Sequence, residues 1–110
     1  AMGVKAGLEP DIMLEAIQAG TGRNAATDLV IPENVLSRSF DFGATIEILL
    51  KDVNLALEEG ENQGVPQFVC QQTRQMLLLA AHKGWRQKDL SEWSKLVEEW
   101  AGVKITSSGN

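Results

Sequence analysis

Between residues 46 and 60 the apolar side chains recur with the period of an α-helix, and this repeat limits the possible folds more than any other feature. They fall at i, i+3, i+4, i+7, i+10, i+11 and i+14: Ile46, Leu49, Leu50, Val53, Ala56, Leu57 and Gly60. Such spacing puts one apolar stripe along a helix, and polar residues such as Glu47, Lys51 and Glu58 occupy another face. The pattern predicts a central helix over residues 44–63 that buries its stripe.

Glycine and proline divide the rest of the chain into further helices. We expect these over residues 10–19, 25–30, 32–38, 66–83 and 90–101. Pro32 predicts a break near Val30 and Ile31, because proline lacks an amide hydrogen and disfavours helical geometry in the residue before it. Gly43 is expected to let the chain turn into the central helix.

Helical spacing also predicts which side chains of the last two helices face inward. For residues 66–83 these are Phe68, Val69, Gln72, Met76, Leu79 and Ala80, and the stripe is widened by Cys70, Leu77 and Leu78. For residues 90–101 they are Leu90, Trp93, Leu96, Val97 and Trp100. The neighbouring acidic pair Glu98-Glu99 is expected on a solvated helix face.

The composition favours an all-α fold. The chain contains no tyrosine, and strand-like alternation is hard to find in it. We therefore expect an all-α helical bundle. A length of 110 residues fits one domain, residues 1–110, with a core over residues 5–102 and a polar, flexible tail over residues 103–110.

The charge balance excludes some partners. The net charge is −5 and no basic stripe is present, so a nucleic-acid partner is not expected. No apolar run reaches the length of a membrane-spanning helix, so we expect no membrane association. The single cysteine, Cys70, excludes an internal disulfide and suits a reducing compartment, which predicts a cytoplasmic protein.

Few side chains in this sequence are suited to catalysis. His82 is the only histidine, and its place at a helix end is typical of a capping or solvated residue. Cys70 lies in an apolar helix and is typical of a packed residue rather than a nucleophile. No histidine or cysteine residues have the spacing of a metal site, so we expect no metal.

Two charged features have both a structural and a functional interpretation. Lys51 and Asp52 lie in the middle of the central helix, where Glu47 and Lys51 are spaced as an ordinary i, i+4 surface pair. Arg23 follows a Gly-Thr-Gly turn, which either offers N–H groups to an anion or is a plain loop with an Asn or Thr cap. Physical arguments alone favour the structural interpretation of both.

Three segments in a fixed order resemble one enzyme family. They are AGLEPDIMLEAIQAGTGRNAA, FDFGATIEILLKDVNLALEEGENQGVP and GWRQKDLSEWSKLVEEWAG. The most specific part is Leu50-Lys51-Asp52-Val53, then Leu55-Ala56, with Gly64-Val65-Pro66 downstream. Over residues 5–102 the chain resembles the C-terminal helical domain of the β-hydroxyacid dehydrogenases, which include 3-hydroxyisobutyrate dehydrogenase, tartronate semialdehyde reductase and the related 6-phosphogluconate dehydrogenases.

The resemblance implies a two-domain enzyme that uses NAD or NADP and begins with a Rossmann domain. In such an enzyme Lys51 matches the lysine that reaches the bound cofactor, and Asp52 matches the neighbouring aspartate that shapes the site. Arg23 matches the Gly-rich turn near the substrate. The family's catalytic lysine and the Rossmann fingerprint are not in this sequence, so we expect no catalytic residue, no tight cofactor binding and no activity from this chain alone.

Two functions therefore remain open. The first is the substrate-side and oligomerisation domain of an NAD(P)-dependent β-hydroxyacid dehydrogenase, without its Rossmann domain. The second is a stand-alone helical module for protein interaction that descends from that domain. The expected partner is a second copy of the chain, as in a dimer, or the missing Rossmann domain.

Overall fold

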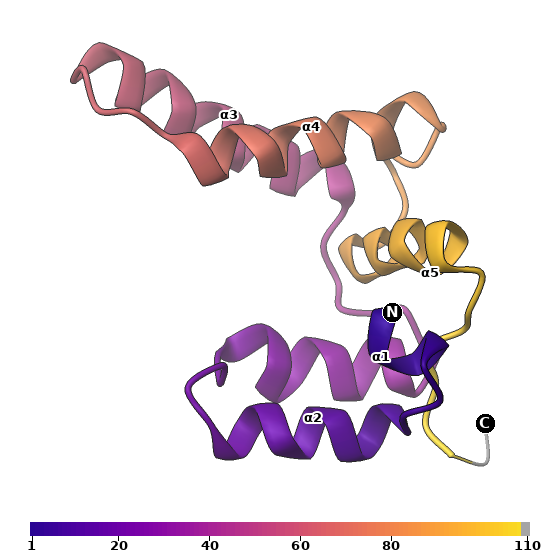
Figure 1. Ribbon diagram of the computed structural model, residues 1–110. Helices are drawn as coiled ribbons and strands as arrows, with labels where there is room; N and C mark the ends of the chain where they lie inside the picture. The colour runs from indigo at the N-terminus through magenta and orange to yellow at the C-terminus, as the bar shows by residue number, and fades with distance from the viewer. Residues whose placement is uncertain (109–110) are drawn as a thin grey trace. The chain divides into compact units, whose positions relative to one another are not determined.

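The computed structural model describes residues 1–108, and its regular structure is helical throughout (Figure 1). The elements are α1 (Met2–Lys5), α2 (Pro10–Ala19), the π-helix η1 (Ala26–Leu36), α3 (Ile46–Asn62), α4 (Phe68–His82), the 3₁₀-helix η2 (Leu90–Ser94) and α5 (Lys95–Ala101). No strand occurs among these residues, so the prediction of an all-α fold is confirmed. In the same part of the chain, no helix is both long enough and apolar enough to cross a membrane.

The chain divides into two compact units. The first unit contains residues 1–42 and the C-terminal segment from residue 94, and the second contains residues 43–93. Each has its own helix packing, described separately below. The prediction of one domain over residues 1–110 stays a prediction.

In the second unit, α3 and α4 pack side by side (Figure 1). Helix α3 buries Ile46, Leu50, Leu57 and Gly60. These four positions belong to the stripe that the spacing predicts, so the predicted inner face of the central helix is confirmed. Removing such apolar surface from water is the main stabilising term in a small domain.

Helix α3 begins at Ile46, two residues later than predicted, because the segment 86–90 binds the chain in front of it. Its first N–H groups, which have no partner within the helix, are satisfied here. The Ile46 and Glu47 amides donate to the carbonyls of Lys88 and Arg86, at 3.0 and 2.9 Å. The Thr45 hydroxyl caps the Ile48 amide at 3.2 Å. Gly43, at φ 101°, makes the turn before it that the sequence predicts.

The predicted inner face of α4 is partly wrong. The buried side chains are Leu77, Ala80 and Ala81, whereas Phe68 and Val69 are each 81% exposed. Because α4 carries apolar residues on more than half of its circumference, periodicity alone left its orientation undetermined. The contact with α3 selects the face that contains Leu77.

In the first unit, α2 and η1 pack together, and η1 continues through Pro32 (Figure 1). The predicted break at Val30–Ile31 is therefore wrong. Proline disrupts an α-helix because it lacks an N–H and its ring meets the carbonyl four residues back. The π-helical turn is wider and moves the hydrogen-bond partner one residue further, so the ring fits without a break.

The C-terminal part of the chain also differs from expectation. The predicted helix 90–101 is a 3₁₀ turn followed by α5, and Trp100 is exposed instead of facing inward. Residues 105–108 of the expected flexible tail hydrogen bond to earlier segments. The Ser107 amide donates to the Leu36 carbonyl at 3.0 Å, and the Ser107 hydroxyl donates to Asp11 at 2.8 Å. The last residues of the predicted tail, 109 and 110, lie outside the described part.

Candidate functional site

Lys51 and Asp52 are exposed near the middle of α3. The side chains are 66% and 62% exposed, and the Lys51 Nζ lies 3.9 Å from the Asp52 Oδ1. Glu47 does not form the expected i, i+4 pair with Lys51, because its Oε2 accepts a 2.9 Å hydrogen bond from the Arg86 guanidinium. The structural explanation of Lys51 as one half of an ordinary helix pair therefore does not apply.

Lys51 instead borders a groove on the second unit, which we call the Lys51 groove. Its volume is 410 Å³. The lining residues are Glu47, Leu50, Lys51, Asn54, Leu55, Glu58, Arg74, Leu78 and Arg86. Leucines line part of it, and the cations and carboxylates come from α3, α4 and the segment after α4. The groove has the size of a site for one small organic ligand.

The Lys51 groove is more positive than the rest of the chain. Three cations, Lys51, Arg74 and Arg86, face two carboxylates, Glu47 and Glu58. The chain as a whole carries a net charge of −5. A local excess of positive charge beside apolar side chains favours an anionic ligand with an apolar part.

The ionisable side chains that line the Lys51 groove are those of lysine, arginine and glutamate. Neither His82 nor Cys70 lines it. Among residues 1–108 there is no group of three His, Cys, Asp or Glu side chains that could hold a metal ion. The groove can therefore bind and orient a ligand, and the side chains in its lining that could transfer a proton are those of Glu47, Glu58 and Lys51.

Arg23 lies in the first unit, in the turn between α2 and η1. Its guanidinium forms an exposed ion pair with Asp28 at 3.2 Å. Asn24 and Thr27 cap the start of η1 reciprocally: the Thr27 amide donates to the Asn24 side chain, and the Asn24 amide donates to the Thr27 hydroxyl. These contacts favour the structural interpretation of the turn, and a role for Arg23 at the substrate stays a prediction.

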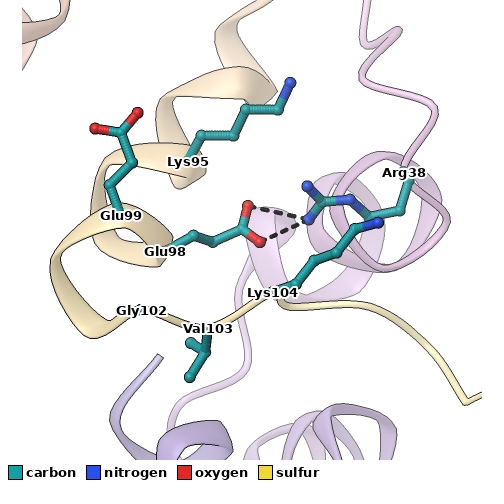
Figure 2. A pocket seen from close by; sticks show the side chains of 7 residues that line it. All are labelled: Arg38, Lys95, Glu98, Glu99, Gly102, Val103 and Lys104. Carbon is teal, nitrogen blue, oxygen red and sulfur yellow. Dashed lines mark hydrogen bonds and ion pairs between the residues drawn. The ribbon is translucent and has the colours of Figure 1, made fainter.

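A second charged site, on the first unit, was not predicted from the sequence. Figure 2 shows Glu98 of α5 facing Arg38, whose guanidinium donates to both carboxylate oxygens at 3.0 and 2.8 Å. The Glu98 side chain is only 7% exposed, so the expectation of a solvated residue at this position is wrong. The Ile105 amide also donates to Glu98, and Arg38 donates to the Ile105 carbonyl.

The backbone next to this pair has unusual geometry. Arg38 and Phe40 have φ angles of 65° and 48°, in the left-handed region that side chains rarely adopt. The Asn34 carbonyl accepts from the Phe40 amide, and Lys95 Nζ lies 4.2 Å from the centre of the Phe40 ring. Periodicity could not reveal this site, because it joins residues 60 positions apart. Its hydrogen bonds join chain segments, which indicates a structural role.

Comparison with known proteins identifies the family to which this all-helical chain belongs. Residues 1–97 match the family described as NAD-binding of NADP-dependent 3-hydroxyisobutyrate dehydrogenase. The chain is 30% identical over 105 residues to a 2-(hydroxymethyl)glutarate dehydrogenase from Eubacterium barkeri, covering 96% of this chain and 35% of that enzyme. It thus spans about a third of the curated relative's length.

The class is that of domains from NAD(P)-dependent dehydrogenases. More particularly, the chain belongs to the β-hydroxyacid dehydrogenase family, through its 3-hydroxyisobutyrate dehydrogenase branch. The resemblance noted in the sequence is confirmed at this level. The matched family is described by NAD binding, and the substrate-side position expected from the sequence stays a prediction.

Proposed function

We propose that this chain is the C-terminal helical domain of an NAD(P)-dependent β-hydroxyacid dehydrogenase, and that the Lys51 groove contributes to its cofactor and substrate site. The position of Lys51 carries this proposal. It is exposed, its expected partner Glu47 pairs with Arg86 instead, and it borders a groove whose lining has three cations and two carboxylates. Asp52, adjacent on α3, is not among the lining residues of the groove, and a part for it in shaping the site stays a prediction.

The charges and apolar side chains of the Lys51 groove are suited to binding the phosphate-bearing part of a dinucleotide. A dinucleotide carries negative phosphates beside flat apolar rings, and the groove offers cations beside Leu50, Leu55 and Leu78. When bound, the nicotinamide of NAD or NADP supplies hydride transfer. This chain's own side chains would hold the negative charge and orient the ligand. The family's catalytic lysine has no counterpart in this sequence, and no strand for a Rossmann unit occurs among residues 1–108.

The chain alone should therefore lack turnover. A partial site forms too few contacts to offset the entropy lost on binding, so we expect at most millimolar affinity for NAD or NADP. Activity should need a Rossmann domain, and a hydroxyacid such as 3-hydroxyisobutyrate is the class of substrate that the family implies.

The test is complementation. The 110-residue chain is mixed with a separately produced Rossmann half of a related dehydrogenase, and NADH or NADPH formation is followed at 340 nm with 3-hydroxyisobutyrate and 2-(hydroxymethyl)glutarate. We expect activity with the wild-type chain and at least a ten-fold loss with Lys51→Ala. Lys88→Ala, which removes an exposed lysine of the same unit outside the groove, is the matched control. Activity that is equal in all three chains would contradict the assigned role of Lys51.

An interaction module is the second candidate function, and the exposed apolar residues of α4 favour it. Phe68, Val69 and Leu79 are exposed on a helix that elsewhere packs against α3. Self-association would bury them, as expected for a dimer. Sedimentation at high micromolar concentration tests this: a dimer that Phe68→Ser converts to a monomer supports it, and a monomeric wild type contradicts it.

A further inference from the structure

We infer that Arg74 and Arg86 form, together with Lys51, a binding site for an oxyanion, a phosphate or a carboxylate. This inference deepens the proposed function, because it concerns the same groove. It adds two residues from outside α3, neither of which lies in the Lys51-Asp52 motif.

Arg74 is held in position by a neighbour that leaves most of its donors available. It projects from α4, and its Nε donates to the Asn54 side-chain oxygen of α3 at 2.6 Å. An arginine has five N–H donors, so this contact uses one and leaves the four N–H groups of the terminal nitrogens. Within residues 1–108 these terminal nitrogens make no hydrogen bond or ion pair. A guanidinium fixed through Nε presents a fork that matches the two oxygens of a carboxylate or phosphate.

Arg86 is held at the start of α3 by a backbone and a side-chain contact, both with Glu47. Its carbonyl accepts from the Glu47 amide at 2.9 Å, and its guanidinium donates to the Glu47 carboxylate at the same distance. The ion pair is exposed, at 47% for Arg86 and 44% for Glu47. Exposed pairs of this kind contribute little to stability, so an incoming oxyanion can share or replace Glu47 at low cost.

The cations of the groove lie beside apolar side chains. Leu50, Leu55 and Leu78 line the same groove, and low-polarity surroundings strengthen a charge interaction relative to open water. Glu58 is the remaining carboxylate in the lining. After a ligand displaces Glu47, three cations would therefore face it and a single carboxylate would oppose it.

The experiment measures binding of two probes to the full 110-residue chain by NMR titration of backbone amides. Inorganic pyrophosphate represents a phosphate source, and glutarate represents a carboxylate source. We expect saturable shifts at residues of the groove, with millimolar affinity that falls at least five-fold in both Arg74→Gln and Arg86→Gln. Lys88→Gln, outside the groove but also neutralising one cation of this unit, should bind within two-fold of the wild type.

The two probes identify the natural oxyanion. Tighter binding of pyrophosphate assigns the site to a phosphate, and tighter binding of glutarate assigns it to a carboxylate. Absence of saturable binding, or equal losses in Lys88→Gln and the arginine variants, overturns the inference. An unchanged amide spectrum outside the groove shows that each variant is folded, and Arg74→Lys and Arg86→Lys replace any variant that is not.

The anion titration and the complementation assay can fail independently of each other. Anion binding that depends on both arginines, without activity on complementation, supports the site and contradicts the dehydrogenase role. Activity that depends on Lys51 while both arginine variants bind anions normally supports the dehydrogenase role and overturns the present inference.

Discussion

The first unit buries its most closely paired charges, whereas the second unit keeps its cations at the surface. Glu98 is buried and accepts hydrogen bonds from Arg38 and the Ile105 amide, so its charge joins the C-terminal segment to the residues that follow η1. Lys51 and Arg86 are exposed, and Arg74 has a single side-chain partner. A buried charge destabilises the fold unless hydrogen bonds and an opposite charge compensate for its lost hydration. An exposed charge keeps its hydration and remains available to a ligand. The difference indicates a structural role for the Arg38–Glu98 pair and favours a binding role for Lys51, Arg74 and Arg86.

The largest expected effect comes from breaking the buried pair. Glu98→Ala removes both carboxylate oxygens that accept from the mostly buried Arg38 guanidinium, and with them the acceptor of the Ile105 amide. We expect a loss of about 3–5 kcal/mol in the free energy of unfolding, measured by urea denaturation. The control is Glu99→Ala at the exposed neighbouring position, which should cost about 0.5 kcal/mol or less. Equal losses would show that Glu98 does not hold this unit.

A second prediction concerns the packing of α4 in the other unit. Leu77 is fully buried at 0% exposure, so Leu77→Ala creates a cavity and should cost about 2–5 kcal/mol. Phe68→Ala removes a larger side chain on the same helix, but one that is mostly exposed, and should cost below about 1 kcal/mol. Thermal and urea unfolding of both variants gives the comparison. The reverse order would restore the inner face predicted from the sequence.

Periodicity predicted the buried face of a helix where the sequence of that helix alone determines it. The stripe through Ile46, Leu50 and Leu57 identified the buried face of α3, because most of the apolar side chains of that helix lie along this one stripe. Helix α4 is apolar around more of its surface, so the buried face there depends on the neighbouring helix. Pro32 was misread for a related reason, since a π-helical turn that admits proline has no distinct sequence signal.

The same distinction applies to the candidate site. Lys51 was a candidate because it lies in a local motif that resembles the family. Arg74 and Arg86, in contrast, become neighbours of Lys51 only when α4 packs on α3 and the segment after α4 returns to the start of α3. Glu98 was misassigned because its partner Arg38 lies 60 positions away. Contacts between residues so far apart in the sequence cannot be predicted from residue spacing or composition.

A smaller, pH-dependent effect tests whether the C-terminal segment is held as the structure indicates. The Ser107 hydroxyl and the Ser108 amide donate to the Asp11 carboxylate, and these hydrogen bonds lower the pKa of Asp11 below its ordinary value. A carboxyl whose pKa is lower in the folded state stabilises the fold above its unfolded pKa, about 3.9, and this contribution disappears as the pH falls through the folded pKa.

The measurement is an NMR titration of the Asp11 carboxyl carbon in the wild type and in Ser107→Ala. The variant should raise the pKa of Asp11 toward the ordinary value, and the stability difference between the two chains should shrink below about pH 4. An Asp11 that titrates identically in both chains would indicate that the segment is free in solution.

The smallest expected effect on stability is at the proposed binding residue itself. Lys51 contacts Asp52 at 3.9 Å, but adjacent residues on a helix do not face each other, so this pair adds little to the fold. Lys51→Gln should change the free energy of unfolding by less than about 0.5 kcal/mol, the range of ordinary surface substitutions. The same variant should weaken pyrophosphate or glutarate binding, whereas Lys88→Gln should not. A loss of stability above about 1 kcal/mol would place Lys51 with Glu98, among the charges that hold the fold, and would remove the contrast between the two units.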